Sequence, residues 1–292
     1  MDGNDWLAVR FEDHRTHLRA VGYRMLGSLS DADDAIQETW LRLSRSEADT
    51  LANLGGWLTT VMGRVCLDML RSRKVRREDS IDDRQLPDPI VSPVEGTNPE
   101  HEALLGDSVG LALLVVLDTL TPAERLAFVL HDMFAVSFEE VALVVGKSTA
   151  ATRQLASRAR RRVRGSTPPP APDLGRQREV VDAFLAASRG GDFDALVAVL
   201  DPDVVLRVDT GAGILKVVRG AEAVSAQALS FARFAHSSVP TLVNGAVGLV
   251  TAPDGRMQSV MAVTIANGRI VEMFIVADRT RLGRIDAALA RD

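Results

Sequence analysis

The sequence predicts a multidomain chain in which two all-α blocks precede a C-terminal α+β module. Apolar residues recur at helical spacing through most of the first 165 residues, whereas short β-branched runs take over after residue 200. Two of these runs, 260–266 and 270–276, are joined by Asn267-Gly268, a pair that is typical of a tight hairpin turn. Helices followed by strands within one segment predict a small cone, in which a curved antiparallel sheet packs against helices.

Two segments rich in proline divide the chain into three modules. The first, residues 78–100, mixes prolines with acidic residues and reads as a loop. The second contains the run STPPPAP at 166–172, which predicts an extended and fairly stiff connection. A chain of 292 residues is long enough for two or three compact units. The expected modules are residues 6–77, 101–165 and 176–290, with linkers at 78–100 and 166–175.

The first module is predicted to consist of helices interrupted at residues 27–30 and 51–56. Within it, residues 31–43 place four apolar side chains at helical spacing, which should face the core: Ala32, Ile36, Trp40 and Leu43. The other side of this helix is acidic. Judged from the residues alone, that acidic side is either an ordinary solvated face or a docking surface.

The second module carries two clear helix starts. Thr121 with Glu124 and Ser137 with Glu140 both have the spacing of a capping box. The second start opens a predicted helix-turn-helix, in which residues 138–145 and 149–162 flank a turn at Gly146. The second helix of such a motif enters the major groove of DNA. Its buried side is predicted to consist of Ala150, Leu155 and Ala159.

The third module alternates helices and strands. Residues 178–187, 193–200 and 221–235 are predicted helices, the second capped by Asp192. The expected strands are residues 204–208, 241–243, 248–252, 260–266 and 270–276.

Arginine is concentrated in two runs although the chain is acidic overall, with a formal net charge of -5. One run spans residues 71–77 and the other 153–164, and neither contains an acidic residue. Cations are favoured near helix C-termini by only a few tenths of a kcal/mol, which is too little to explain such density. The pattern predicts two surfaces that contact phosphates, although a basic helical hairpin without DNA remains an alternative.

Other features exclude several classes of protein. The acidic N-terminus lacks the basic start of a secretory signal, and no apolar run is long enough to span a bilayer. The single cysteine, Cys66, excludes an intramolecular disulfide framework and is expected to be a buried structural thiol. We therefore expect a cytoplasmic protein. No cluster with ligand spacing predicts a metal site, and no cofactor is expected.

The acidic helix and the sequence after it resemble region 2 of bacterial RNA polymerase sigma factors. In that family, this helix docks on the clamp helices of the polymerase large subunit. The resemblance implies a set of core-binding residues: Asp31, Asp34, Gln37, Glu38 and Leu41.

The loop 51–57 and the basic helix after it resemble the part of region 2 that opens the promoter. In sigma factors, this loop captures a base flipped out of the non-template strand, and the helix supports the -10 element. Extruding a base costs a few kcal/mol, so it requires both a pocket and backbone contacts. A structural role at the start of the helix remains the alternative for Trp57. The resemblance assigns -10 contacts to Asn53, Gly56, Trp57, Arg64, Asp68, Arg71, Lys74, Arg76 and Arg77.

The predicted helix-turn-helix occupies the place of sigma region 4, which reads the -35 element. Arginine and glutamine side chains can contact guanine and adenine in a bidentate manner. Residues 160–164 lie beyond the recognition turn and are expected to contact phosphate instead. The -35 candidates are Lys147, Ser148, Arg153, Gln154, Ser157, Arg158 and Arg161.

The two helical modules together resemble the extracytoplasmic-function (ECF) class of sigma factors, which lacks the intervening third region. The resemblance covers residues 6–165. It implies an alternative sigma factor that binds RNA polymerase core, through the clamp helices and the flap, and binds promoter DNA. The stretch 153–160 resembles a SigJ-like subgroup, which carries a fused C-terminal SnoaL-like (NTF2-like) domain.

The third module resembles that SnoaL-like domain and would modulate activity in cis, through contact with the sigma domains or their linker. The subgroup has a WLPEP-like motif in the linker, and DGGGK-like and NPDKL-like motifs in the tail. The counterparts here are 84–89, 209–216 and 278–282, and each departs from its pattern. They supply the regulatory candidates Leu86, Pro87, Pro89, Asp209, Gly211, Gly213, Lys216, Asp278 and Leu282.

Two other functions remain open from the sequence. One is a DNA-binding regulator that never engages polymerase core. The other is a SnoaL-type isomerase or cyclase with a helical appendage, which would need a carboxylate or histidine in an apolar pocket. Asp209 and His236 are the candidates, but Asp209 is expected in a turn and His236 ends a helix. We therefore expect no enzymatic activity.

Overall fold

The computed structural model describes residues 3–46, 53–78, 85–92, 110–166, 172–213 and 215–289. Internal contacts divide the chain into two compact units. The first contains residues 1–81, 102–106 and 113–167, and so includes most of both predicted helical modules. The second contains residues 168–292 together with residues 107–112 and the linker segment 82–101. No helix in the described ranges is long and apolar enough to cross a membrane.

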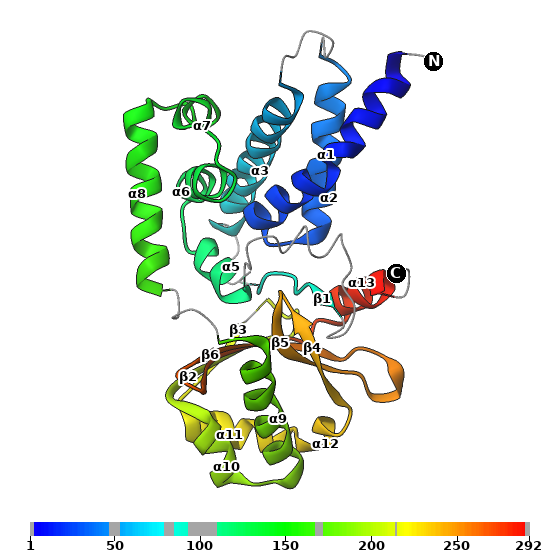
Figure 1. The fold of residues 1–292 in the computed structure, drawn as a ribbon, viewed down its shortest axis with the longest axis vertical. Helices are drawn as coiled ribbons and strands as arrows, with labels where there is room; N and C mark the ends of the chain where they lie inside the picture. The colour runs from blue at the N-terminus through cyan, green and yellow to red at the C-terminus, as the bar shows by residue number, and fades with distance from the viewer. Residues whose placement is uncertain are drawn as a thin grey trace. The chain divides into compact units, whose positions relative to one another are not determined.

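The first helical module contains three long helices (Figure 1). They are α1 (Gly3–Leu26), α2 (Leu29–Leu43) and α3 (Leu54–Glu78). A corner joins α1 to α2, where Gly27 takes a left-handed conformation and the Ser28 hydroxyl caps the first turn of α2. The predicted helices and the break at residues 27–30 are confirmed. Of the break predicted at 51–56, residues 54–56 are already helical, and residues 51 and 52 lie outside the described residues. Ala32, Ile36 and Leu43 are buried as predicted, whereas Trp40 is only half-buried.

The three helices pack closely around Gly22. A Cβ atom built at Gly22 would lie 2.5 Å from Met62 Cε of α3 and 3.0 Å from Ala32 Cβ of α2. Met62 Cε ends a flexible side chain and can move, but Ala32 cannot, so a side chain larger than that of glycine would press on α2. Cys66 is fully buried in the same module, and burial raises the pKa of its thiol to about 12. The expected buried thiol is confirmed.

The second helical module contains α5 (Leu111–Asp118), α6 (Pro122–Phe128), a π-helical turn (Val129–Met133), α7 (Phe138–Val145) and α8 (Thr149–Ser166). Both predicted capping boxes are present, at Thr121 and at Ser137. Gly146 closes α7 in a left-handed conformation and makes the turn into α8. The helix-turn-helix is therefore confirmed.

The second unit is built on a seven-stranded sheet with the order β1-β4-β5-β6-β7-β2-β3. The strands are β1 (Val91–Ser92), β2 (Leu200–Asp209), β3 (Leu215–Arg219), β4 (Ser238–Val243), β5 (Ala246–Thr251), β6 (Ser259–Ala266) and β7 (Arg269–Val276). The β6–β7 hairpin turns at Asn267-Gly268 as predicted, with positive φ at both residues. The expectation of a fully antiparallel sheet is wrong, because β2 runs parallel to β7.

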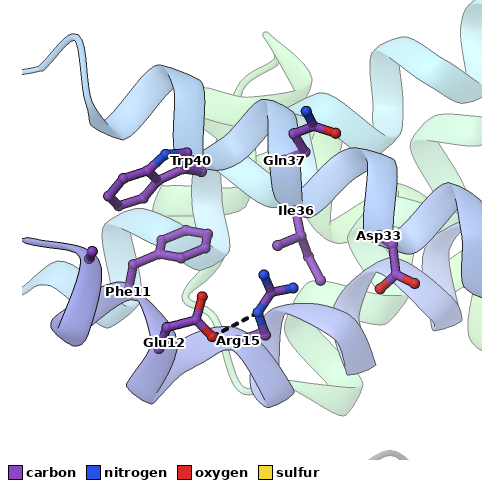
Figure 2. A pocket seen from close by; sticks show the side chains of 8 residues that line it. Phe11, Glu12, Arg15, Asp33, Ile36, Gln37 and Trp40 are labelled. Carbon is purple, nitrogen blue, oxygen red and sulfur yellow. Dashed lines mark hydrogen bonds and ion pairs between the residues drawn. The ribbon is translucent and has the colours of Figure 1, made fainter.

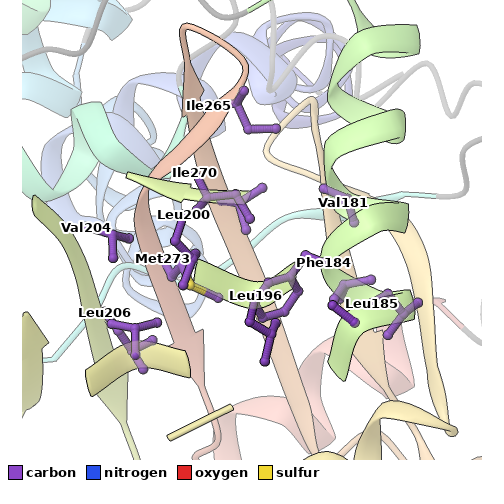
Figure 3. Packing of buried hydrophobic residues seen from close by; sticks show 14 of the residues in the cluster. Val181, Phe184, Leu185, Leu196, Leu200, Val204, Leu206, Ile265, Ile270 and Met273 are labelled. Atoms are coloured by element: carbon purple, nitrogen blue, oxygen red, sulfur yellow. The ribbon is translucent and has the colours of Figure 1, made fainter. Parts of the chain in front are cut away.

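Helices cover one face of this sheet, giving the expected α+β cone (Figure 1). They are α9 (Leu174–Gly190), α10 (Phe193–Val199), α11 (Ala221–Ser230) and α12 (Ala232–Ala235), and α13 (Arg279–Leu289) follows the last strand. The predicted single helix 221–235 is thus broken at Phe231. Figure 3 shows part of the apolar core of this unit, to which Phe184 and Leu196 of the helices and Leu206 and Met273 of the sheet belong.

The linker segment is not the free loop that its proline content predicted. Val91 and Ser92 form β1, which pairs antiparallel with Val243 and Leu242 of β4. The preceding residues 86–90 are mostly buried. The linker therefore forms part of the second unit.

We predict that Gly22→Val destabilises the protein by about 1–3 kcal/mol, because a branched side chain at this position overpacks the junction of three helices. Thermal unfolding of the full chain would measure the effect. Gly165→Ala is the matched control, since a Cβ at that helical position meets no atom within 4 Å. An equally stable Gly22→Val variant would contradict the packing described here.

Candidate polymerase and promoter interfaces

The outer face of α2 presents most of the predicted core-binding residues together. Asp34, Gln37 and Leu41 are exposed, and they follow one another at helical spacing. Glu38 is half-buried and forms an ion pair with Arg42 at 2.9 Å. Asp31 differs from the others, because its carboxylate pairs with Arg73 of α3. The face therefore presents the carboxylate of Asp34 and the amide of Gln37 near the exposed Leu41. Asp31 lies at the edge of this face and is held by Arg73.

A cavity of about 400 Å³ lies beside this face, between α1 and α2. Figure 2 shows Phe11 and Trp40 lining it, with their ring centroids 5.1 Å apart in an edge-to-face arrangement. Ile36 adds to the apolar lining, while Gln37 and Asp33 contribute polar groups. Gln37 belongs to both features, so the cavity extends the polar face into an apolar recess.

The start of α3 brings three of the predicted -10 residues together. The Asn53 side-chain oxygen accepts a hydrogen bond from the Gly56 backbone N–H at 3.0 Å, and so caps the helix. A Cβ atom at Gly56 would lie 2.6 Å from Asn53 Nδ2, so the glycine allows the cap to form. Trp57 follows directly and is half-buried, which leaves part of its ring accessible.

The remaining -10 candidates continue along one side of α3. Arg64, Asp68 and Arg71 are exposed and are separated by four and three residues, so they share a face with Trp57. Arg71 and Asp68 lie 3.9 Å apart, a loose pair between groups that are both more than half exposed. The side chains of Lys74, Arg76 and Arg77 lie outside the described residues.

All the predicted -35 residues are exposed on one side of α8 and the turn before it. The Ser148 hydroxyl accepts a hydrogen bond from the Ala151 N–H, which caps the helix. Arg153 lies 3.3 Å from Glu139 and 5.5 Å from the centre of the Phe138 ring. These contacts fold Arg153 along the surface of α7. Because both charges are largely exposed, the ion pair contributes little to stability. Arg153 can therefore leave Glu139 to contact a base.

The buried side of α8 differs in part from the sequence expectation. Thr152, Ala156 and Ala159 are buried, whereas Ala150 is exposed and Leu155 is half-buried. The helix is rotated relative to that expectation, but its polar side is the expected one.

Two arginines of the second basic run point toward their own module. Arg160 pairs with Asp132 at 2.7 Å, and Arg162 pairs with the buried carboxylate of Glu124 at 3.2 Å. Their guanidinium groups are thus engaged within the module. Arg158 and Arg161 are exposed. The run therefore divides into arginines that hold the module together and arginines that face solvent.

The regulatory candidates meet around the carboxylate of Asp209, which is 2% exposed at the end of β2. One of its oxygens accepts a hydrogen bond from the Leu86 backbone N–H of the linker at 2.9 Å. The same oxygen accepts one from Arg281 of α13 at 2.8 Å, and the other oxygen accepts the Gly211 N–H. Three segments distant in sequence are therefore joined at one buried group.

Arg281 is the residue that sequence reasoning missed. Besides Asp209, it donates to Asp88 at 2.7 Å and to the Leu86 carbonyl at 2.6 Å. Its side chain is only 11% exposed, so it is a shielded, multiply bonded guanidinium. The sequence did contain a signal for it. Arg281 immediately precedes Leu282, so it supplies the basic residue expected in the NPDKL-like motif at 278–282.

The other regulatory candidates divide into two groups. Asp278 caps α13, and a Cβ at Gly211 would lie 2.6 Å from its Cγ, so the two are adjacent. Leu86, Pro87, Pro89 and Leu282 are buried. Lys216 and Gly213 do not join this contact in any interaction that we observe. Lys216 instead donates to Gln227 on α11 at 2.8 Å.

A second pair of hydrogen bonds fixes the linker near β1. The Asn244 backbone N–H donates to the Ile90 carbonyl at 2.8 Å, and the Asn244 side chain accepts the Ile90 N–H at 3.1 Å. Asn244 is 1% exposed and has a positive φ, which asparagine tolerates better than most residues. The linker is thus held at both ends of the segment 86–92.

Comparison with known proteins supports these features. The family model "Sigma-70 region 2" matches residues 10–76, and "Sigma-70, region 4" matches residues 110–163. The chain is 38% identical over 289 residues to the ECF RNA polymerase sigma factor SigJ of Mycobacterium tuberculosis H37Rv, covering 92% of this chain and 90% of that protein. It is 33% identical to a protein named "Probable ECF RNA polymerase sigma factor SigI" from strain CDC 1551 / Oshkosh, covering 99% of each.

The solved structures agree with the sequence comparison. A crystal structure of M. tuberculosis extracytoplasmic function sigma factor SigJ matches with a TM-score of 0.76 and 34% identity, covering 94% of this chain and 98% of that one. The likeness extends over both helical modules and the C-terminal module. This chain belongs to the extracytoplasmic-function class of the sigma-70 family, whose members direct RNA polymerase to promoters.

Proposed function

We propose that the outer face of α2 is the surface that docks on the clamp helices of the polymerase large subunit. Asp34, Gln37 and Leu41 supply the exposed acidic, amide and apolar groups that such a helix would meet. The adjacent recess lined by Phe11 and Trp40 gives an apolar side chain of the partner a place to enter. Central apolar contacts with a polar surround are what a specific interface requires.

The two DNA surfaces are proposed to act on different parts of one promoter. Trp57 and the Asn53 cap at the start of α3 would receive an unstacked base of the -10 element, while Arg64 and Arg71 contact the backbone. Arg153, Gln154 and Arg158 at the start of α8 would read the -35 element in the major groove. The flap would hold the second helical module in place.

One observation carries this assignment. The arginines of α8 differ in the carboxylates that they meet. Arg160 and Arg162 pair with Asp132 and Glu124, which are largely shielded from solvent, whereas Arg158 faces solvent and Arg153 pairs only with the exposed Glu139. The exposed arginines share one face of α8 with polar residues that could contact base edges. This arrangement favours DNA binding over a role in solubility alone.

The C-terminal module is proposed to modulate activity in cis by holding the linker between the two sigma modules. The linker joins the surface that opens the promoter to the surface that reads the -35 element, so its free length limits their separation. Arg281, Asp209 and Asn244 bind residues 86–92 and remove that length from the connection.

We propose that this module does not act as an enzyme. The Asp209 carboxylate, the one buried candidate base, is occupied by Arg281 and two backbone N–H groups. His236, the other candidate, is exposed. The interior of this module is filled by tightly buried apolar residues such as Leu196, Leu206 and Met273 (Figure 3).

The polymerase surface is tested by reversing charge on α2. Asp34→Lys combined with Glu38→Lys should reduce capture of purified core polymerase at least tenfold, because the surface then repels the groups that it now attracts. The matched control is Asp173→Lys, an exposed acidic residue that caps α9 in the other unit. Unchanged capture by the α2 variant would favour a DNA-binding regulator that does not engage core.

The recognition helix is tested by Arg153→Ala, which should weaken use of the -35 element by about 1–3 kcal/mol if its base contact is bidentate. Competition between wild-type and altered -35 sequences in a run-off assay measures the effect. Arg160→Ala is the control, since Arg160 also lies on α8 but pairs with Asp132 of the π-helical turn. Equal losses in both variants would show that α8 supports the module without reading bases.

The regulatory contact is tested by Arg281→Met, which keeps an unbranched apolar stem and removes the guanidinium group with its charge. The change leaves the buried Asp209 carboxylate without its cationic partner. Breaking a fully buried ion pair in this way lowers the free energy of unfolding by about 3–5 kcal/mol. Amide exchange at residues 86–92 should rise, and promoter output should change. Lys216→Met is the control, and unchanged output after release of the linker would remove the regulatory role.

A further inference from the structure

We propose that Arg73 is a positioning residue that fixes the promoter-opening helix α3 against the polymerase-docking helix α2, and that Asp31 acts through Arg73 rather than by touching polymerase. The inference deepens the proposed function and rests on it. It changes the role of one residue, since the family resemblance assigns Asp31 to the polymerase contact.

The argument begins at the corner between α1 and α2. Helix α1 ends at Leu26, and the carbonyl groups of its last turn lack partners within the helix. Helix α2 begins two residues beyond Gly27, with Asp31 in its first turn. A carbonyl end and an acidic first turn thus lie side by side, which makes this corner a favourable place for a cation.

Arg73 of α3 occupies that place. Its Nη1 donates to the Leu26 carbonyl at 3.4 Å, and its Nη2 pairs with the Asp31 carboxylate. The planar guanidinium can serve both partners at once because its donors point in fixed, divergent directions. One side chain therefore joins the end of α1, the start of α2 and the last third of α3.

Burial separates Arg73 from the other cations of its helix. Its side chain is 25% exposed, and that of Asp31 is 31% exposed, whereas Arg71 is 55% exposed. Residues 71 and 73 are about 200° apart around a helix, so they point to opposite sides. Arg71 lies on the face shared with Arg64 and Trp57, while Arg73 faces the corner.

The packing below the pair explains why its geometry matters. Met25 and Leu26 are buried at the end of α1, and Gly22 of α1 lies close to both Ala32 of α2 and Met62 of α3. The ion pair closes this junction where it reaches solvent. The polymerase face of α2 and the DNA face of α3 lie on different helices, so the angle between α2 and α3 sets how a docked polymerase presents the -10 surface.

The test compares Asp31→Asn, Arg73→Gln and the exchange Asp31→Arg with Arg73→Asp, all in the full-length chain bound to host core polymerase. We expect core affinity to stay within twofold of wild type in both single variants. Promoter opening at saturating holoenzyme, followed by permanganate reactivity of unpaired thymines, should fall about two- to fivefold, the range expected for a half-exposed pair. The exchange variant should recover at least half of the lost opening.

Two readouts separate positioning from direct contact. If Arg73 contacted phosphate, Arg73→Gln would lower the salt dependence of promoter binding by about one unit, as expected for Arg71→Gln; positioning predicts an unchanged slope. If Asp31 contacted polymerase, Asp31→Asn would weaken core capture, as the α2 charge reversal does. Either result overturns the inference, and so does an exchange variant without recovery.

Thermal unfolding of each variant controls for loss of the fold. A single variant that opens promoters poorly only because it unfolds would recover when assayed below its transition, which would also overturn the positioning role. A wild-type holoenzyme that opens no promoter would instead refute the proposed function as a whole. The two failures are therefore distinguishable.

Discussion

The structure depends on one constraint: a guanidinium group that leaves water must find carboxylates or carbonyls to replace it. Arg281 is 11% exposed and is surrounded by Asp209, Asp88 and the Leu86 carbonyl. Arg125 is 2% exposed, donates to the Arg24 carbonyl at 3.2 Å and pairs with Asp118. Burial lowers the pKa of Arg125, and Asp118 opposes that shift. Each inward arginine thereby joins segments that are distant in sequence.

The same constraint identifies the arginines that are free to act on a partner. Among the arginines of the two basic runs whose side chains are described, those that face solvent include Arg71 on α3 and Arg153, Arg158 and Arg161 on α8, close to polar residues that can contact bases. An acidic face on α2 lies in the first of these modules. A chain with a net charge of -5 thus places exposed cations beside these polar residues, where they can attract DNA although the chain as a whole is acidic.

Local features were predictable from the sequence, and long-range ones were not. The capping boxes at Thr121 and Ser137 depend on residues three positions apart, so their pattern is complete within one helical turn. The pairing of Val91 with Val243 spans about 150 residues, and the prolines around Val91 resemble those of a free loop. The prediction of an antiparallel sheet failed at β2 and β7 for the same reason. Nothing in the sequence of either strand indicates that its partner runs parallel to it.

The candidate sites follow the same division. Helical spacing correctly placed the predicted -35 residues on an exposed side of α8, although it misassigned Ala150 to the core. Spacing could not reveal that Asp31 is paired with Arg73, or that Asp209 is bound by Arg281, because each pair joins elements far apart in the chain. Family resemblance locates functional surfaces, whereas the contacts decide which residues on them are free.

The central claim is that two exposed surfaces on separate helical modules act together on one promoter once polymerase is bound. Run-off transcription with purified host core polymerase and this chain, on promoters with both elements intact or with either one scrambled, tests it most directly. The account predicts transcripts from the intact promoter and a sharp loss when either element is altered. No transcript from any host promoter, even after removal of the C-terminal module, would contradict it.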